Sequence, residues 1–437
     1  MLAGIIRILE PHFLNSKNSR AKPILKEGPF KGLKLPSMTA EANAAYIFQE
    51  IIGAFLITHP HLDHVSGLAI NTPIIEAGSG PKPVAALPSV LAAIKNHVFN
   101  DVIWPNLSDE DGGAGLLTYQ RLVEGGNPRF GNGESRGYVR ACQGIVTKCL
   151  SVSHGRCKQR YHPESGNHQR ATSSVFLSGD SRHLRPRAIS VDQSTEGGFY
   201  SPARSPGLMP GEPMLSSVES SAFFLRDHES GNEIIVFGDV EPDSISLEPR
   251  NRRVWETAAP KIANGKLRAI FIECSYTDSV DDAYLYGHMC PRHLVAELTV
   301  LADLVLSDNQ SGGVERKRKR PGLGEQAVYD NNARFKRTQS SSGSKPRSTS
   351  SRYSEPLDGL GDLYMFEEFD PPDPTRWADI ETPPLAELSI YIIHIKELLK
   401  DGINPGTRII EELNAHSNLI RLGCRFFLPS PSEAISC

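Results

Sequence analysis

The sequence lacks several features that would assign it to other classes of protein. Its seven cysteines include no CxxC pair, so neither a disulfide framework nor a common zinc module is expected. It contains no apolar run of about 18 residues, the minimum for a membrane-spanning helix. The formal net charge is −4, whereas a general nucleic-acid binder is usually basic on one face. Membrane and nucleic-acid partners are therefore not expected.

The first residues, MLAGIIRILEPHF, lack the cationic start and the small-residue cleavage site of a signal peptide. They favour an amphipathic helix, and a cytoplasmic protein is the default expectation. The basic run KRKR at 317–320 leaves a nuclear address open, although a solvated charge run is the simpler interpretation. No feature of the sequence predicts an oligomeric state.

Segments whose apolar residues are spaced as in strands alternate with segments whose apolar residues are spaced as in helices along most of the chain. Strands are expected at 51–57, 144–155, 220–227, 233–239, 267–275, 388–396 and 425–429. Helices are expected at 41–50, 84–99, 291–306 and 408–423. The turn sequence HESGN between two of these strands predicts a β-hairpin over 220–239. The alternation as a whole favours an α/β layered fold.

Two stretches interrupt this pattern. Residues 156–215 are rich in Gly, Ser, Arg and Pro, and residues 307–375 include ERKRKRPG and SSSGSKPRSTSSR. Low apolar content and many breaker residues predict a surface insertion at 156–215 and a disordered insertion at 307–375. Residues 1–430 are therefore expected to form a single domain that carries both insertions.

The sequence HPHLDH directly follows the buried strand expected at 51–57. His59 and His61, two residues apart on a tight turn, can direct their imidazoles at one ion, and Asp63 and His64 can reach a second ion. Imidazole and carboxylate suit zinc and similar divalent metals. A surface turn with chance histidines is the alternative, but His and Asp seldom cluster after such an apolar run unless they are paired or ligated.

A site for two metals needs more ligands than this box holds, and rigid strand ends are the expected place for them. His154 ends CLSVSH, Asp239 ends EIIVFGD and His394 ends SIYIIH. A single histidine at a strand end is more often structural. Three such residues together with the HPHLDH box favour convergence at one edge of a sheet.

These motifs resemble those of the class II cyclic-nucleotide phosphodiesterases of fungi and some bacteria, within the metallo-β-lactamase superfamily. The matching segments are HPHLDHVSGL, SHG, VFGDVEPD, IECSY, the GH before a proline-bearing helix start, and IIHIK. The resemblance implies a metallo-β-lactamase αββα sandwich and two divalent metal ions, with zinc as the expected metal. It implies that one metal is held by His59, His61 and His154, that the other is held by Asp63, His64 and His394, and that Asp239 bridges them.

The resemblance also implies a proton donor for the leaving oxygen. His288 takes that role, oriented by Glu273, and we count Asp63, His288 and Glu273 as the catalytic residues. The competing assignment makes His288 a metal ligand and leaves His394 outside the site. Family members begin with several strands that this sequence lacks, so the N-terminal part of one sheet is expected to be missing.

The implied activity is hydrolysis of 3′,5′-cyclic AMP to the 5′-nucleotide by a hydroxide that two metals activate, which would end cyclic-AMP signalling. The substrate is then a small molecule, with cyclic GMP as an alternative to cyclic AMP. Two other interpretations stay open. One is another hydrolase of the superfamily, such as an RNA 3′-processing nuclease, and the other is a catalytically dead, truncated paralogue.

Overall fold

The computed structural model describes residues 1–14, 24–75, 80–157, 159–170, 215–312, 375–377, 379–396, 402–430, 433 and 435. The basic run at 317–320, nearly all of the predicted insertion at 307–375, and residues 171–214 of the other predicted insertion lie outside these residues. Met1–Ser311 and Pro372–Cys437 form one compact unit, and it contains all the elements discussed below.

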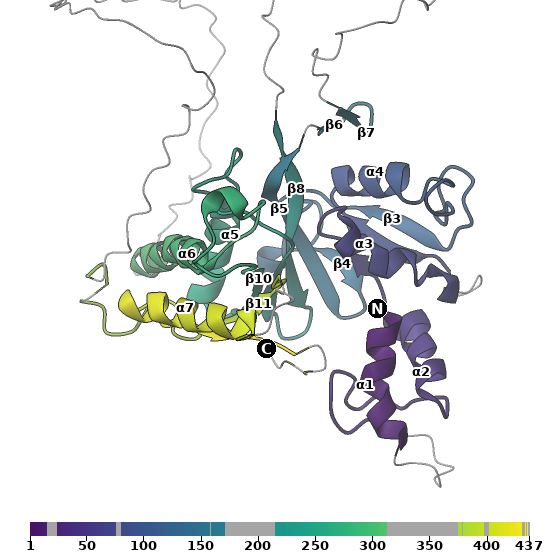
Figure 1. Cartoon of the computed structure of the whole chain (residues 1–437), viewed down its shortest axis with the longest axis horizontal. Helices are drawn as coiled ribbons and strands as arrows, with labels where there is room; N and C mark the ends of the chain where they lie inside the picture. The colour runs from purple at the N-terminus through teal and green to yellow at the C-terminus, as the bar shows by residue number, and fades with distance from the viewer. Residues whose placement is uncertain are drawn as a thin grey trace, which may run out of the picture. The chain divides into compact units, whose positions relative to one another are not determined.

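The strands of this unit form two main sheets (Figure 1). The first contains the parallel strands β1 (Phe55–Leu56), β2 (Lys82–Ala86) and β3 (Leu117–Arg121). The second has the order β12-β11-β10-β9-β8-β5-β4. Its strands are β4 (Val139–Cys142), β5 (Ile145–Cys157), β8 (Ser216–Asp227), β9 (Glu233–Phe237), β10 (Leu267–Glu273), β11 (Ser389–Ile393) and β12 (Arg425–Phe427). Strands β9 to β12 are mutually parallel, and the pairs from β4 to β9 are antiparallel.

The other elements are seven α-helices and a small hairpin among the described residues. The helices are α1 (Leu2–Leu14), α2 (Ala40–Tyr46, continued by a π-helical turn at Ile47–Ile51), α3 (Leu62–Ala69), α4 (Pro88–His97), α5 (Asn251–Ala263), α6 (Pro291–Gly312) and α7 (Pro405–Leu419). The hairpin pairs β6 (Gln159–His162) with β7 (Asn167–Arg170). Short 3₁₀ turns occur at Thr72–Ile74, Gly133–Ser135 and Asp282–Tyr284.

The alternation of side chains along β5 and β8 joins two hydrophobic cores. Cys149 and Phe223 are buried in the core that contains the first sheet with α3 and α4. Their sequence neighbours Leu150 and Phe224 are buried in the core that contains α5, α6 and α7. Because side chains alternate across a strand, the long sheet is covered on one face by the first sheet and on the other by helices. The layers are therefore helix, sheet, sheet, helix, and the predicted αββα sandwich is confirmed (Figure 1).

Most of the predicted elements are present, with three corrections. The hairpin over 220–239 is confirmed as β8 and β9. The strand expected at 51–57 shortens to Phe55–Leu56, because helical structure continues to Ile51. The helix expected at 84–99 begins only at Pro88, since the residues before it form β2. Part of the expected insertion at 156–215 is ordered as β6 and β7.

A buried carboxyl group between two helices makes the stability of the fold dependent on pH. Glu297 of α6 accepts hydrogen bonds from the Asp243 amide at 2.7 Å and from Trp255 Nε1 at 2.6 Å. Burial, reinforced by the charge of Asp243, raises the pKa of Glu297 to about 7. A raised carboxyl pKa stabilises the folded state below the pKa of the unfolded chain, and this contribution is lost as the pH rises through 7.

We therefore expect the free energies of unfolding of the wild type and of Glu297→Gln to converge as the pH rises from 5 to 8. The advantage of the wild type should shrink by on the order of 1–3 kcal/mol, because Gln does not titrate. Urea denaturation of both proteins at each pH measures this difference. A gap that stays constant across the range would contradict the assignment.

Candidate metal centre

The HPHLDH box lies where the first sheet passes into α3. His59 and His61 occupy the loop after β1, and His61 is the N-cap residue of α3. Asp63 and His64 follow in the first turn of that helix. Val65 and Leu68 on the same helix are fully buried in the core of the first sheet, so packing fixes the turn that presents the four polar side chains.

The remaining candidates come from neighbouring strands of the second sheet. His154 lies near the end of β5, Asp239 follows β9, Glu273 is the last residue of β10 and His394 follows β11. Because β9, β10 and β11 are parallel, their carboxyl ends meet at one edge of the sheet. His288 reaches the same edge from the loop before α6.

All nine residues named from the sequence come together there. Within each of three overlapping groups, the potential ligand atoms lie within 4.8 Å of one another. The groups are His59, His61 and His154; Asp63, His64, Asp239 and His394; and His154, Asp239, Glu273 and His288.

Asp239 occupies the middle of this arrangement. Its Oδ2 lies 3.7 Å from His59 Nε2 and 3.6 Å from His154 Nε2. On its other side, Oδ1 lies 3.1 Å from His64 Nε2 and Oδ2 lies 3.1 Å from His394 Nε2. Burial alone would raise the pKa of Asp239, but the close approach of the His394 and His64 imidazoles outweighs it and holds the pKa well below the usual range. The carboxylate is thus charged and faces both sets of histidines.

The histidines of the first group are held in their neutral form. Burial, together with the neighbouring His64, lowers the pKa of His59 to about 2. Burial also lowers the pKa values of His61 and His154. A metal ligand must be a neutral imidazole with an available lone pair, and these surroundings favour that form at neutral pH.

The hydrogen-bond partners of these rings also suit metal binding. His154 Nδ1 donates to the carbonyl oxygen of Gly287 at 2.8 Å, which leaves the lone pair on Nε2, the atom facing Asp239. His59 is completely buried, and its Nε2 has no hydrogen-bond partner among the described residues. A buried polar atom without a partner is costly. A divalent cation would satisfy it, so the residues present fit a metal site.

His288 and Glu273 form a separate buried pair beside the cluster. His288 Nδ1 lies 2.9 Å from Glu273 Oε2. The carboxylate also accepts the Val240 amide at 2.6 Å, and Ser275 Oγ lies 2.5 Å from it. Ser275 Oγ is also 2.6 Å from the carbonyl oxygen of His394. The ends of β9, β10 and β11 are thus tied together around Glu273.

The close approach of two loops explains why Gly287 is needed behind His154. Gly287 has φ +86°, and a Cβ there would lie 2.4 Å from the amide nitrogen of Gly155. Its carbonyl group also fixes the tautomer of His154.

For Gly287→Ala we therefore expect metal affinity to fall roughly 10- to 100-fold, as when other supports of a ligand histidine are lost. Titration with zinc in a competing chelator buffer measures this change. Gly144→Ala is the matched control, because it also has positive φ, but its Cβ would meet open space. An equal loss in both variants would show that only backbone strain is involved.

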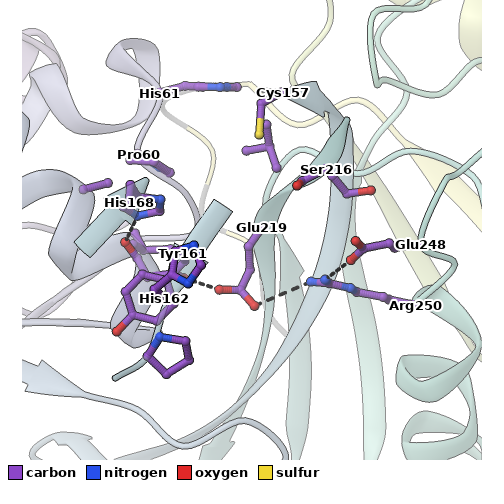
Figure 2. Close-up of a pocket in the computed structure, with 16 residues that line it drawn as sticks. Pro60, His61, Cys157, Tyr161, His162, His168, Ser216, Glu219, Glu248 and Arg250 are labelled. Atoms are coloured by element: carbon purple, nitrogen blue, oxygen red, sulfur yellow. Dashed lines mark hydrogen bonds and ion pairs between the residues drawn. The ribbon is translucent and has the colours of Figure 1, made fainter. Parts of the chain in front are cut away.

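A cleft of about 600 Å³ opens beside the cluster, with His61 and Pro60 in its lining (Figure 2). Its other walls come from the start of α4, the start of β8, the β6–β7 hairpin and the segment before α5. No sequence pattern indicated this cleft, because its residues come from distant segments, one of them within the predicted insertion.

Comparison with known proteins finds similarity to one family of phosphodiesterases. A model of the class-II cAMP phosphodiesterases matches residues 30–125 and 193–313. The chain is a relative of that family. A 3′,5′-cyclic-nucleotide phosphodiesterase of Schizosaccharomyces pombe is 30% identical over 266 residues, which are 61% of this chain and 56% of that protein. One from Aliivibrio fischeri is 26% identical over 279 residues, 64% of this chain and 62% of that protein. The chain thus spans less than two thirds of the length of either relative.

Among solved structures, that of unliganded yeast PDE1 is similar to this chain, with a TM-score of 0.52 and 21% sequence identity. The similarity covers 90% of this chain and 70% of that chain, and it supports the fold assignment. No helix in the described part of the chain is long and apolar enough to span a membrane.

Proposed function

We propose that the protein hydrolyses 3′,5′-cyclic nucleotides, in particular cyclic AMP, to the 5′-nucleotide. The observation that carries this proposal is the convergence of two histidine groups on Asp239, with the His288–Glu273 pair beside them. The names of the curated relatives support the same substrate class. Hydrolysis at this site would end cyclic-AMP signalling.

The two groups around Asp239 suit two divalent cations, and we propose zinc because imidazole and carboxylate are its usual ligands. The proposed ligands of one cation are His59, His61 and His154; those of the other are Asp63, His64 and His394, with Asp239 between the two. Bound cations would neutralise the phosphate oxygens and make an attacking water more acidic.

The chain itself would supply the proton for the leaving 3′ oxygen. Glu273 holds Nδ1 of His288, so Nε2 is the ring atom that would exchange a proton with the substrate. The buried carboxylate keeps the ring in place. General acid assistance of this kind contributes about 10²–10⁴ in rate.

We prefer this role for His288 to that of a metal ligand. His394 Nε2 is 3.1 Å from Asp239 Oδ2, whereas His288 Nδ1 is 3.8 Å from the same atom and already faces Glu273. His394 also adopts φ +57°, a strained conformation that in other proteins is concentrated at functional sites.

The test is hydrolysis of cyclic AMP by the purified, zinc-loaded protein, with His61→Ala as the inactive control. We expect 5′-AMP as the only nucleotide product, identified by chromatography against a 3′-AMP standard. Release of 3′-AMP, or equal turnover by His61→Ala, would contradict the proposal.

A further inference from the structure

The cleft beside the metal centre contains polar groups that the proposed chemistry does not use. Glu219 of β8 contacts Ser89, at the start of α4, and faces Arg250, the N-cap residue of α5. Figure 2 shows the Glu219–Arg250 pair. His61 lines the same cleft but is well separated from the Glu219–Arg250 pair in this view. A ligand held near His61 would therefore have room to extend toward Glu219.

Two buried polar atoms of the cleft lining have no hydrogen-bond partner among the described residues: Arg250 Nη1 and Ser217 Oγ. Arg250 Nη2 bonds the Glu248 carboxylate, while Nη1 is 3.5 Å from Glu219 Oε1. The other oxygen of Glu219 accepts the hydroxyl proton of Ser89. The cleft thus contains a long ion pair between Glu219 Oε1 and Arg250 Nη1, and the latter atom makes no hydrogen bond among the described residues. Buried groups of this kind are normally satisfied, and here a ligand would satisfy them.

An aromatic wall faces these groups from the β6–β7 hairpin. Tyr161 of β6 lines the cleft, and its ring centroid is 5.3 Å from that of His168. The hairpin is tied to α4, because His168 Nε2 donates to the Ser89 carbonyl oxygen at 2.8 Å and Asn96 bonds Asn167 at 3.0 Å. A positioned aromatic ring is the surface on which a nucleobase stacks.

We propose that this cleft binds the base of the substrate and selects a base with an exocyclic amine. The amine would donate a hydrogen bond to Glu219, and Arg250 would donate one to a neighbouring acceptor of the base. Adenine and guanine both carry an amine or ring N–H next to an acceptor on one edge. A base without such a donor would displace water from the Glu219 carboxylate without replacing the lost hydrogen bond. This inference rests on the proposed function and extends it to specificity.

The experiment compares cyclic AMP with the 3′,5′-cyclic phosphate of purine riboside, which lacks only the amine. Bis(p-nitrophenyl) phosphate, which has no base, reports the metal centre alone. We expect wild-type kcat/KM to favour cyclic AMP by about 10- to 100-fold, the range for a lost hydrogen bond to a charged group. Glu219→Ala should bring this ratio close to one and leave hydrolysis of the base-free diester unchanged.

Two further variants separate this role from a structural one. Glu219→Gln keeps one acceptor oxygen, so it should recover part of the preference. Glu229→Gln, on the exposed turn between β8 and β9, should retain the wild-type preference. If Glu219→Ala lowered turnover of all three substrates equally, or kept the wild-type ratio, the inference would be overturned.

Binding of adenosine, measured by calorimetry, makes failure of the subsite distinguishable from failure of the proposed function. Adenosine has no phosphate and needs no metal. If the wild type hydrolysed no cyclic nucleotide, at least tenfold weaker adenosine binding by Glu219→Ala would still support the base site. Equal affinity of both proteins, or no binding by either, would refute the site.

Discussion

Asp239→Ala is expected to lower kcat/KM for cyclic AMP by about 10³-fold or more, because the loss of a shared ligand forfeits several kcal/mol of transition-state stabilisation. Asp239 is the carboxylate that faces both histidine groups, at 3.1 Å from His64 and from His394. Its removal would also take away the carboxylate that lies between the two proposed cation sites. The zinc content of the purified variant should therefore fall together with its activity.

The matched control for this change is Asp109→Asn, an exposed position that should keep full zinc content and turnover. Circular dichroism of Asp239→Ala would show whether the sandwich is still folded. A folded Asp239→Ala variant that retained both metal content and activity would contradict the central position of this residue.

His288→Ala is expected to lower kcat for cyclic AMP by about 10²–10⁴-fold while the zinc content stays at the wild-type value. The loss should depend on the leaving group. A sugar alkoxide needs a proton as it departs, whereas p-nitrophenolate is stable without one. Hydrolysis of bis(p-nitrophenyl) phosphate should therefore be much less affected by the same substitution.

Glu273→Gln should reproduce this pattern in weaker form, since an amide oxygen still accepts from His288 Nδ1 but is a weaker acceptor than a carboxylate. Metal analysis separates the two possible roles of His288. A large loss of zinc from His288→Ala, with equal loss of activity on both substrates, would identify the residue as a ligand instead.

The ligand candidates could be predicted from sequence because metal chemistry restricts both residue type and position. His59, His61, Asp63 and His64 lie within six residues, His154 lies near the end of β5, and Asp239 and His394 each follow an apolar strand. Parallel strands bring such ends to a common edge, so the convergence followed from the order of the strands. The His288–Glu273 pair depended on the resemblance, because nothing local to LYGHM identifies a proton donor.

The supporting contacts could not be predicted in this way. The Gly287 carbonyl group fixes His154, and the Ser275 hydroxyl group lies between Glu273 and His394. Two of these three contacts, Gly287 with His154 and Ser275 with His394, join residues far apart in the sequence. The cleft residues Glu219 and Arg250 are ordinary surface types in the sequence. Only the packing of β8, α4 and α5 places them in the cleft that His61 also lines.

The fold itself was predictable where apolar periodicity is long and clear, as in β5, β8 and α6. The prediction failed where a short strand and a helix are joined without a polar break. At Pro88, for example, α4 begins with a single residue between it and the end of β2. The prediction also missed the β6–β7 hairpin, whose polar residues resemble a loop in sequence but form two paired strands.

The measurement that most directly tests the central claim is titration of the metal-free protein with zinc while bound metal and cyclic-AMP turnover are followed in the same sample. The account predicts that binding saturates at two zinc ions per chain and that turnover to 5′-AMP reaches its plateau only as the second ion binds. Full turnover with one ion, or turnover that persists in the metal-free protein, would contradict it.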